Sequence, residues 1–228
     1  MSAGNIRLYS YWRSSAAYRV RIALNLKGLP FETMPVHLLQ DGGQQHTPEF
    51  NDLNPQELVP VLLHGSRILR QSMAIIEYLD ETHPNPPLLP ADPLGRARVR
   101  ALAQTVACEI HPVNNLRILK YLGGTLKVTD EQRDAWYNHW VLEGLRSYER
   151  RLQDLAAQRA AAGLQPSVYS YGDTPTLADC CLVPQIFNGQ RFNTPLDGLP
   201  RTMAAFDACM ALPAFQQAQP SACPDFEA

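Results

Sequence analysis

Two serines stand where a short apolar-aromatic strand runs into an amphipathic helix. The segment reads Tyr9-Ser10-Tyr11-Trp12-Arg13-Ser14-Ser15-Ala16-Ala17-Tyr18. The Ser14 and Ser15 hydroxyls, together with the N–H groups of the first turn, lie at the positive end of the helix dipole, which stabilises an anion. Arg13 directly precedes them. The serines either only cap the helix or form an anion site. In such a site Ser14 would donate a hydrogen bond, because no G-x-S-x-G motif marks a nucleophilic serine.

Two further positions in the same half of the chain are candidates for ligand contacts. Val59-Pro60 falls where a central strand is expected, and a strand proline indicates an edge, a bulge or a cis peptide. A cis peptide would present Val59 N–H and C=O to an extended peptide ligand, whereas the simpler alternative is an edge-strand proline. Gln71-Ser72 falls between a strand and a helix, where Ser72 either holds a ligand carboxylate or only caps the helix.

The second half of the chain places polar side chains within helical patterns. The segment with the most of them reads His111-Pro112-Val113-Asn114-Asn115-Leu116-Arg117. Pro112 is expected to kink its helix, and the kink either groups His111, Asn115 and Arg117 along a cleft or leaves them on a solvated face. Arg191 ends a later helix, where it either complements the helix dipole or binds a carboxylate.

The elements that position these residues fall into two groups. Strands are predicted at Ile6–Trp12, Phe31–Leu38, Leu58–His64 and Arg67–Leu69, and helices from Ser14 or Ser15 to Lys27 and over Met73–Thr82. A strand-helix-strand unit is typically parallel, whereas the turn at Gly65-Ser66 predicts an antiparallel hairpin. Residues 41–53 are expected to form a loop and a short helix. The order is therefore β-α-β-α-β-β-α, an α/β domain.

A proline-rich segment separates this domain from a helical region. Five prolines between His83 and Pro93 predict a stiff, extended connector. Helical patterns follow at 92–122, 129–160, 176–190, 200–211 and 214–218, with a surface loop over 156–166. Thr176 and Asp179 have capping-box spacing. We therefore predict an α/β domain over 1–83, a linker over 84–93 and an all-helical domain over 94–228.

Composition excludes several classes of function. The 228 residues are 45% apolar and 18% charged, which is typical of a globular protein with a substantial core. The net charge of −2 gives no basic surface for nucleic acid or an acidic membrane, and no apolar run approaches the ~20 residues of a membrane helix. No signal peptide is apparent before Arg7. The five cysteines lack C-x-x-C spacing and the six histidines lack H-E-x-x-H, so we expect no metal, no disulfides and a cytoplasmic location.

The order of these blocks resembles the glutathione transferase family over nearly the whole chain. The resemblance is strongest to the zeta class, the maleylacetoacetate isomerases. That class carries Ser-Ser-Cys-x-x-Arg-Val-Arg-Ile-Ala-Leu, against Ser14-Ser15-Ala16-Ala17-Tyr18-Arg19-Val20-Arg21-Ile22-Ala23-Leu24 here. Other shared blocks are Asp41-Gly42-Gly43-Gln44-Gln45, Gln71-Ser72-Met73-Ala74-Ile75-Ile76-Glu77-Tyr78-Leu79 and Gly172-Asp173 through Leu182-Val183-Pro184-Gln185.

The resemblance implies a thioredoxin-like first domain that binds glutathione. Pro60 would then be cis, with Val59 paired to the cysteinyl backbone of glutathione. The γ-glutamyl end would contact Gln71 and Ser72, with Gln45 near the glycyl end. Ser14 would stabilise the thiolate, with Ser15 adjacent. His111 and Asn115 match positions near the glutathione site, and the family is usually dimeric, so a homodimer is implied.

The implied reaction is the cis–trans isomerisation of a maleyl oxo-acid, as in the conversion of maleylacetoacetate to fumarylacetoacetate in tyrosine breakdown. Glutathione thiolate adds to the alkene, rotation follows, and elimination returns the thiolate. Arg13, Arg117 and Arg191 are the candidates for the substrate carboxylates, because guanidinium binds carboxylate in a bidentate fork.

Three other functions remain open from the sequence. The first is isomerisation of maleylpyruvate, since similar enzymes also lack the signature cysteine that Ala16 replaces. The second is glutathione transfer to, or dehalogenation of, small electrophiles. The third is a non-catalytic glutathione-binding module.

Arg19 and Arg21 lie further into the helix that begins at the serine pair, and we expect structural roles for both.

Overall fold

The computed structural model describes residues 6–227, which divide into two compact units. The first unit contains the described residues up to Leu88 together with the C-terminal segment from Ala211 onward, and the second is Leu89–Met210. These units differ from the expected domains, since the start of the proline-rich segment and the end of the chain belong to the first unit. Positions 1–5 and 228 of the expected domains lie outside the described residues.

A four-stranded sheet with strand order β2-β1-β3-β4 forms the centre of the first unit. Its strands are β1 (Ile6–Ser10), β2 (Glu32–Pro35), β3 (Val61–His64) and β4 (Arg67–Arg70). β1 pairs in parallel with β2 and antiparallel with β3, and β3 pairs antiparallel with β4. Leu62 of β3 lies opposite Leu8 on one side and Leu69 on the other. The predicted α/β fold class is confirmed. Three of the four strands are shorter than predicted, and β4 extends one residue beyond its predicted end.

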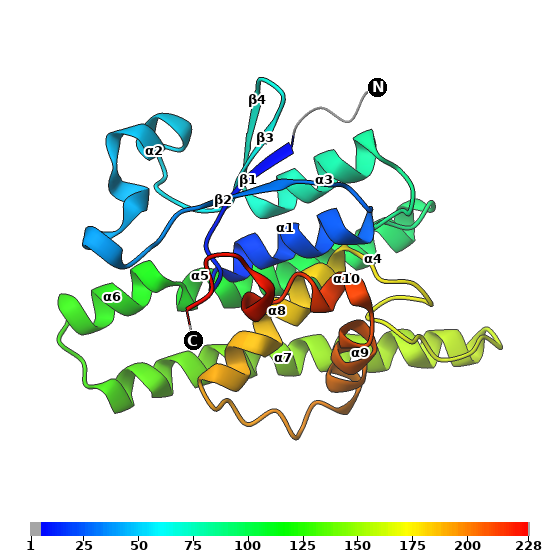
Figure 1. The fold of residues 1–228 in the computed structure, drawn as a ribbon. Helices are drawn as coiled ribbons and strands as arrows, with labels where there is room; N and C mark the ends of the chain where they lie inside the picture. Colours follow the sequence, from blue (N-terminus) through cyan, green and yellow to red (C-terminus); the bar gives the residue numbers. More distant parts are fainter. Residues whose placement is uncertain (1–5, 228) are drawn as a thin grey trace. The chain divides into compact units, whose positions relative to one another are not determined.

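Helices α1 (Ser15–Leu26) and α3 (Ser72–Thr82) lie side by side along the sheet (Figure 1). Between β2 and β3 come two short 3-10 turns, η1 (Gln40–Gly42) and η2 (Gln44–His46), and helix α2 (Pro48–Leu53). Since side chains alternate along a strand, Val61 and Leu63 face away from Leu62. They join a buried apolar cluster with Tyr11 and with Phe50 of α2. The sheet is thus covered by helices on both faces.

The C-terminal segment packs against α1 within the first unit. It contains α10 (Pro213–Gln216) and the 3-10 turn η4 (Pro220–Ala222), drawn in red beside α1 in Figure 1. Asn25 Nδ2 donates to the carbonyl of Ala214 at 3.0 Å, and Arg21 Nε donates to that of Ala218 at 2.9 Å. These side-chain bonds explain why a segment expected in the helical domain belongs to the first unit.

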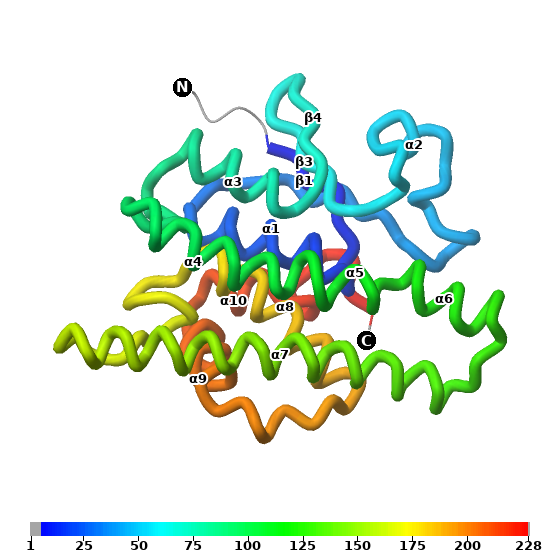
Figure 2. The backbone as a smooth tube through the Cα atoms, turned by 180° about the vertical axis from the view of Figure 1, so that it is seen from behind, coloured from blue at the N-terminus to red at the C-terminus, as the bar shows by residue number. Residues whose placement is uncertain are grey.

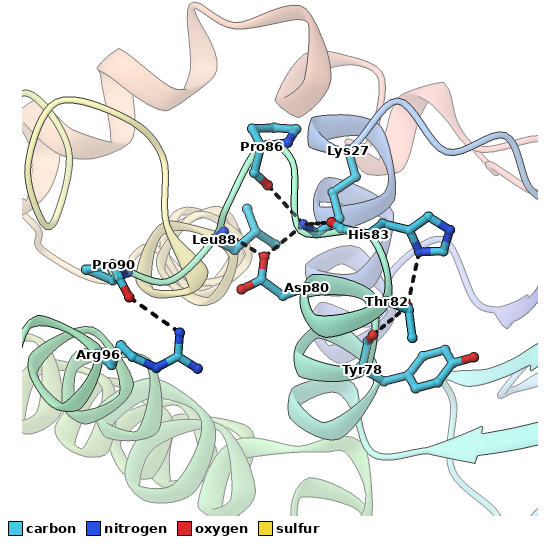
Figure 3. Close-up of polar contacts among 9 residues, drawn as sticks. All are labelled: Lys27, Tyr78, Asp80, Thr82, His83, Pro86, Leu88, Pro90 and Arg96. Atoms are coloured by element: carbon cyan, nitrogen blue, oxygen red, sulfur yellow. Dashed lines mark hydrogen bonds and ion pairs between the residues drawn. The ribbon is translucent and has the colours of Figure 1, made fainter. Parts of the chain in front are cut away.

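Lys27 binds the first part of the proline-rich segment to the first unit (Figure 3). Its buried ammonium donates to Asp80 Oδ1 at 2.8 Å and to the carbonyls of His83 and Pro86 at 2.7 and 2.9 Å. Asp80 Oδ1 also accepts from the N–H of Leu88 at 2.8 Å. Up to Leu88, the segment is therefore bound to the first unit through the Lys27 ammonium. The sequence predicted a stiff, extended connector there.

The second unit is helical throughout its regular structure, with the long α7 running beside α9 (Figure 2). Its elements are α4 (Pro93–Gln104), the π-helix η3 (Thr105–Ile110), α5 (His111–Asn114), α6 (Leu116–Gly124), α7 (Asp130–Ala161), α8 (Leu177–Arg191) and α9 (Pro200–Met210). The predicted capping box at Thr176 is present, and Thr129 with Gln132 forms a second one at the start of α7. No helix among the described residues combines the length and the apolar character needed to cross a membrane.

Two local predictions for this unit are wrong. The chain breaks at Asn115, which is extended (φ −73°, ψ 165°), and not at Pro112. Pro112 lies within a continuous helical run from Pro93 to Asn114, two residues after the end of the π-helix η3. The expected loop over 156–166 begins later, because α7 continues to Ala161.

Candidate functional site

Ser14 is the residue that begins α1. It has extended backbone angles (φ −73°, ψ 113°), and its Oγ accepts from the N–H of Ala17 at 3.2 Å. Ser15 is the first helical residue and is buried. A hydroxyl carries two lone pairs and one O–H, so the cap leaves the Ser14 O–H able to donate to an anion. The helix terminus and this O–H are thus available together at one residue.

Arg21 holds the loop that leads to Ser14. From within α1, its Nη1 donates to Ser10 Oγ at 3.0 Å and to the carbonyl of Tyr11 at 3.4 Å. Its Nη2 donates to the carbonyl of Trp12 at 3.2 Å. Burial lowers the pKa of the guanidinium, yet an arginine stays cationic. Arg21 therefore stabilises the loop before Ser14 through these hydrogen bonds, which agrees with the structural role expected for it.

Val59 and Pro60 precede β3 and are joined by a cis peptide bond, as expected. β3 is an inner strand, so the edge-strand alternative is wrong. Val59 is 7% exposed, and within the part of the chain that the structure describes its N–H and C=O have no hydrogen-bond partner. Buried backbone groups are nearly always paired. Val59 thus offers one donor and one acceptor to an extended ligand.

Gln71 and Ser72 form the junction between β4 and α3. Gln71 has φ 69° and ψ 117°, a strained conformation for a residue with a side chain, and strain of this kind is concentrated at ligand sites. Its Nε2 donates to Gln56 Oε1 at 2.7 Å. The expectation that Ser72 caps the helix is wrong, because Ser72 is the first helical residue and its Oγ accepts from Arg19 Nη1 at 3.3 Å.

Gln45 lies in η2 and is 5% exposed. Its Nε2 is 2.8 Å from His46 Nε2, while its Oε1 is buried without a hydrogen-bond partner among the described residues. Gly43 makes room for this amide: it has φ 110°, and a Cβ there would lie 2.5 Å from Gln45 Nε2. The site therefore contains one buried acceptor that a ligand donor would satisfy.

Three candidate residues surround the break in the second unit. Asn115 caps α6, since its Oδ1 accepts from the N–H groups of Arg117 and Ile118 at 3.0 and 3.2 Å. The Arg117 side chain is exposed and makes no hydrogen bond or ion pair with the described residues. His111, half-buried, is the first residue of α5. The Asn115 Oδ1 thus has a structural task, and Arg117 is the residue here whose side chain is most available to a ligand.

Arg191 is the last residue of α8 and is exposed. Its Nη1 donates to Asn188 Oδ1 at 2.8 Å, and its guanidinium lies 5.7 Å from the centroid of the Phe192 ring. Phe192 in turn stacks on Tyr137 at 3.8 Å. The arginine is therefore held in one region by a hydrogen bond and an aromatic ring, while it stays accessible to an anion.

The candidates divide between the two units. Four of them lie in the second unit, at His111, Asn115, Arg117 and Arg191. The first unit contains the others: Arg13, Ser14, Ser15, Gln45, Val59, Pro60, Gln71 and Ser72. Sequence reasoning missed Asp225, whose Oδ2 accepts from the N–H of Trp12 at 3.0 Å. No local pattern could have identified it, because 213 positions separate the two residues.

Comparison with known proteins identifies the family of the chain. Residues 8–87 match the family model described as Glutathione S-transferase, N-terminal domain. Over 218 residues the chain is 49% identical to a protein named Probable maleylacetoacetate isomerase from Vibrio cholerae serotype O1, with 96% of this chain and 97% of that protein covered. The chain belongs to the glutathione transferase family. The predicted resemblance is thereby confirmed.

Solved structures assign this glutathione transferase to the zeta class. One is a holo structure of maleyl pyruvate isomerase, described as a bacterial zeta-class enzyme, with TM-score 0.89, 47% identity and coverage of 97% of this chain and 100% of that one. Another is maleylacetoacetate isomerase from Anaeromyxobacter dehalogenans 2CP-1 with bound dicarboxyethyl glutathione and citrate. It has TM-score 0.83 and 41% identity, and covers 98% of each chain.

Proposed function

We propose that this glutathione transferase isomerises the cis double bond of a maleyl oxo-acid, with maleylacetoacetate as substrate and fumarylacetoacetate as product. The observation that carries the proposal is the anion site at Ser14, where a helix N-terminus and a donor hydroxyl coincide. Such a site suits a thiolate. The 49% identity to a protein of that name over nearly the whole chain supports the choice of substrate.

The first unit has groups that fit glutathione. Val59 offers to a peptide backbone an N–H and a C=O that no described residue pairs, and Gln45 offers a buried Oε1 that likewise has no partner among those residues. Gln71 and Ser72 stand at the N-terminus of α3, which favours a carboxylate. When bound, glutathione supplies a thiolate that adds reversibly to the alkene beside a carbonyl, so that the bond can rotate before elimination restores the double bond.

The chain's own residues then have separable tasks. Ser14 donates a hydrogen bond to the thiolate, and the α1 terminus lowers the thiol pKa from its ordinary value of ~8.5 toward neutrality. Arg13, Arg117 and Arg191 are the proposed candidates for binding the carboxylates of the substrate. The residue at position 16 takes no part in this chemistry, so alanine serves there.

A second candidate is the isomerisation of maleylpyruvate. The zeta-class structure at 47% identity is named for that substrate, so identity alone does not separate the two acids. Both have a maleyl group and two carboxylates, and the same residues would serve. We also propose that the protein works as a cytoplasmic homodimer in tyrosine and phenylalanine breakdown.

Turnover assays with the purified protein test the proposal. Maleylacetoacetate and maleylpyruvate are each supplied with glutathione, without it, and with S-methylglutathione, which lacks a free thiol. We expect turnover only with glutathione, and faster for maleylacetoacetate. Turnover with S-methylglutathione would exclude the thiolate mechanism, and faster turnover of maleylpyruvate would assign the second substrate. Conjugation of a neutral electrophile without isomerisation of either acid would make the protein a general transferase.

A further inference from the structure

The last described residues of the chain lie against the loop that leads to Ser14. Asp225 Oδ2 accepts from the N–H of Trp12 at 3.0 Å. The next residue, Phe226, meets the Trp12 ring edge-on, with centroids 5.1 Å apart and planes at 80°. Both contacts fall on one loop residue, although the partners come from opposite ends of the sequence.

Glu227 extends the same contact to a second loop. Its Oε1 accepts from Gln40 Nε2 at 2.8 Å, and its Oε2 lies 3.3 Å from His37 Nε2. These are exposed contacts and contribute little energy individually. Their role is to fix the course of the segment, so that Asp225 and Phe226 stay on Trp12.

The backbone of Trp12 is held from both sides. Its N–H is bound by Asp225 and its C=O by Arg21 Nη2 at 3.2 Å. Arg21 also donates from Nε to the carbonyl of Ala218, further back in the C-terminal segment, and its guanidinium attracts the Asp225 carboxylate. One buried cation therefore joins the loop and the segment that covers it.

The Trp12 ring also contacts the Arg13 guanidinium. The Arg13 guanidinium carbon lies 5.3 Å from the centroid of that ring, within the range of a cation–π contact. The orientation of the indole consequently sets where the Arg13 guanidinium is found. Phe226 packs on the same ring and therefore acts on Arg13 through it.

We propose that Asp225 and Phe226 are positioning residues of the active site, which fix Trp12 and through it aim Arg13 at a substrate carboxylate. Neither residue touches the substrate in this scheme. The inference rests on the proposed function, because it takes Arg13 as a carboxylate ligand. It assigns to the C-terminal segment a role in selecting dianionic over neutral substrates.

Two pairs of variants test this inference. Phe226→Ala removes the ring and Phe226→Tyr keeps it; Asp225→Ala removes the acceptor and Asp225→Asn keeps one. Ser221→Ala, an exposed change in the same segment, is the control. We expect Phe226→Ala to raise KM for the maleyl diacid about threefold to tenfold, because the Trp12 ring would no longer hold Arg13 in place, with little change in kcat or in KM for chlorodinitrobenzene. Phe226→Tyr should restore the KM.

A second readout does not depend on activity. Hydrogen exchange at the Trp12 amide should accelerate at least about tenfold in Asp225→Ala and stay slow in Asp225→Asn and Ser221→Ala. An equal rise in KM for the diacid and the neutral electrophile would overturn the inference, as would unchanged KM in both alanine variants. If Phe226→Ala fails to fold, Phe226→Leu carries the same test.

The two hypotheses fail in different ways. A wild-type protein that isomerises no maleyl acid would refute the proposed function, whatever the exchange rate at Trp12. A wild-type protein that isomerises the acid, with a KM that Phe226→Ala and Asp225→Ala leave unchanged, would refute only the positioning role.

Discussion

The Arg19 guanidinium, from within α1, donates through Nη1 to Ser72 Oγ at the first residue of α3, across 3.3 Å. Both side chains are buried, with 2% and 6% of their surface exposed. The bond ties together two helices whose N-terminal regions supply different parts of the proposed glutathione site. The position of Ser72 relative to α1 is therefore fixed by a charged hydrogen bond as well as by apolar packing.

A double-mutant cycle measures this connection. Arg19→Met and Ser72→Ala each remove one partner, and we expect a coupling energy of about 0.5–3 kcal/mol in urea unfolding, because the partners are in direct contact. Each single change should also weaken glutathione binding. Strict additivity of the two losses in stability would show that the bond contributes nothing.

Ser14 has two roles that separate variants distinguish. Ser14→Ala removes both the helix cap and the O–H donor, whereas Ser14→Asn keeps a capping acceptor and loses the hydroxyl. We expect Ser14→Ala to lose about 1 kcal/mol of stability and Ser14→Asn almost none. In both variants the pKa of the thiol of bound glutathione should rise toward ~8.5, and turnover should be about a hundredfold lower. The thiol pKa is measured from the thiolate absorbance as a function of pH. An unchanged thiol pKa in Ser14→Asn would remove the hydroxyl from this role.

Arg191 should discriminate by substrate charge. We expect Arg191→Ala to raise KM for the maleyl diacid about tenfold, since a charged hydrogen bond to a carboxylate is lost, and to leave KM for chlorodinitrobenzene nearly unchanged. Arg151→Ala, on the exposed surface of α7, is the matched control. A similar effect on both substrates would indicate that Arg191 supports the fold only.

Lys27 should be important for stability. Its side chain is fully buried, and the side chain of Asp80, its ion-pair partner, is only 10% exposed. Lys27→Met leaves that carboxylate without its cation, which should cost about 3–5 kcal/mol in urea unfolding. Adding Asp80→Asn removes the stranded charge and should recover part of the loss. Lys120→Met, at an exposed position, should change little.

Cysteine reactivity tests the burial of the thiols. Cys108 is exposed, whereas the other four cysteines are buried. Burial raises the pKa of Cys209 and of Cys223, so at any pH below that raised value each has less reactive thiolate than a free thiol. We expect Ellman's reagent to modify one thiol rapidly in the native protein and all five in urea. Cys108→Ser should abolish the fast phase, and a second fast thiol would contradict the buried arrangement.

Local chemistry explains most of what the sequence predicted correctly. The capping residues Ser14, Thr129 and Thr176 each act on a backbone group within the next few positions, so their effect can be read from adjacent residues. The parallel pairing of β1 with β2 and the antiparallel pairing of β3 with β4 follow from the same logic, since they come from a β-α-β unit and a tight hairpin. Ser14, Ser15 and Ser72 were identified in the same way, each at the start of a helix, whereas Gln45 was identified from the family resemblance alone.

Long-range and conformational details were not predictable. The contact of Asp225 with Trp12 joins positions at the two ends of the chain, and nothing near either residue indicates it. Ser72 has the composition of a cap, yet the chain reaches it through a strained Gln71, and its hydroxyl serves Arg19. Pro112 is a helix breaker by type, but the chain stays helical through it, with the π-helix η3 just before it, and the break lies at Asn115.

Ala16 lies in the first turn of α1, two positions after Ser14, where the zeta-class signature that this chain resembles has a cysteine. A thiol there would stand in the helix-terminus field that we propose lowers the pKa of the glutathione thiol, and would itself become a target for oxidants and electrophiles. A methyl group has no such chemistry. The protein therefore cannot be trapped as a mixed disulfide with glutathione at this position, nor alkylated there by its own unsaturated substrate, and its first turn stays intact when the glutathione pool is oxidised.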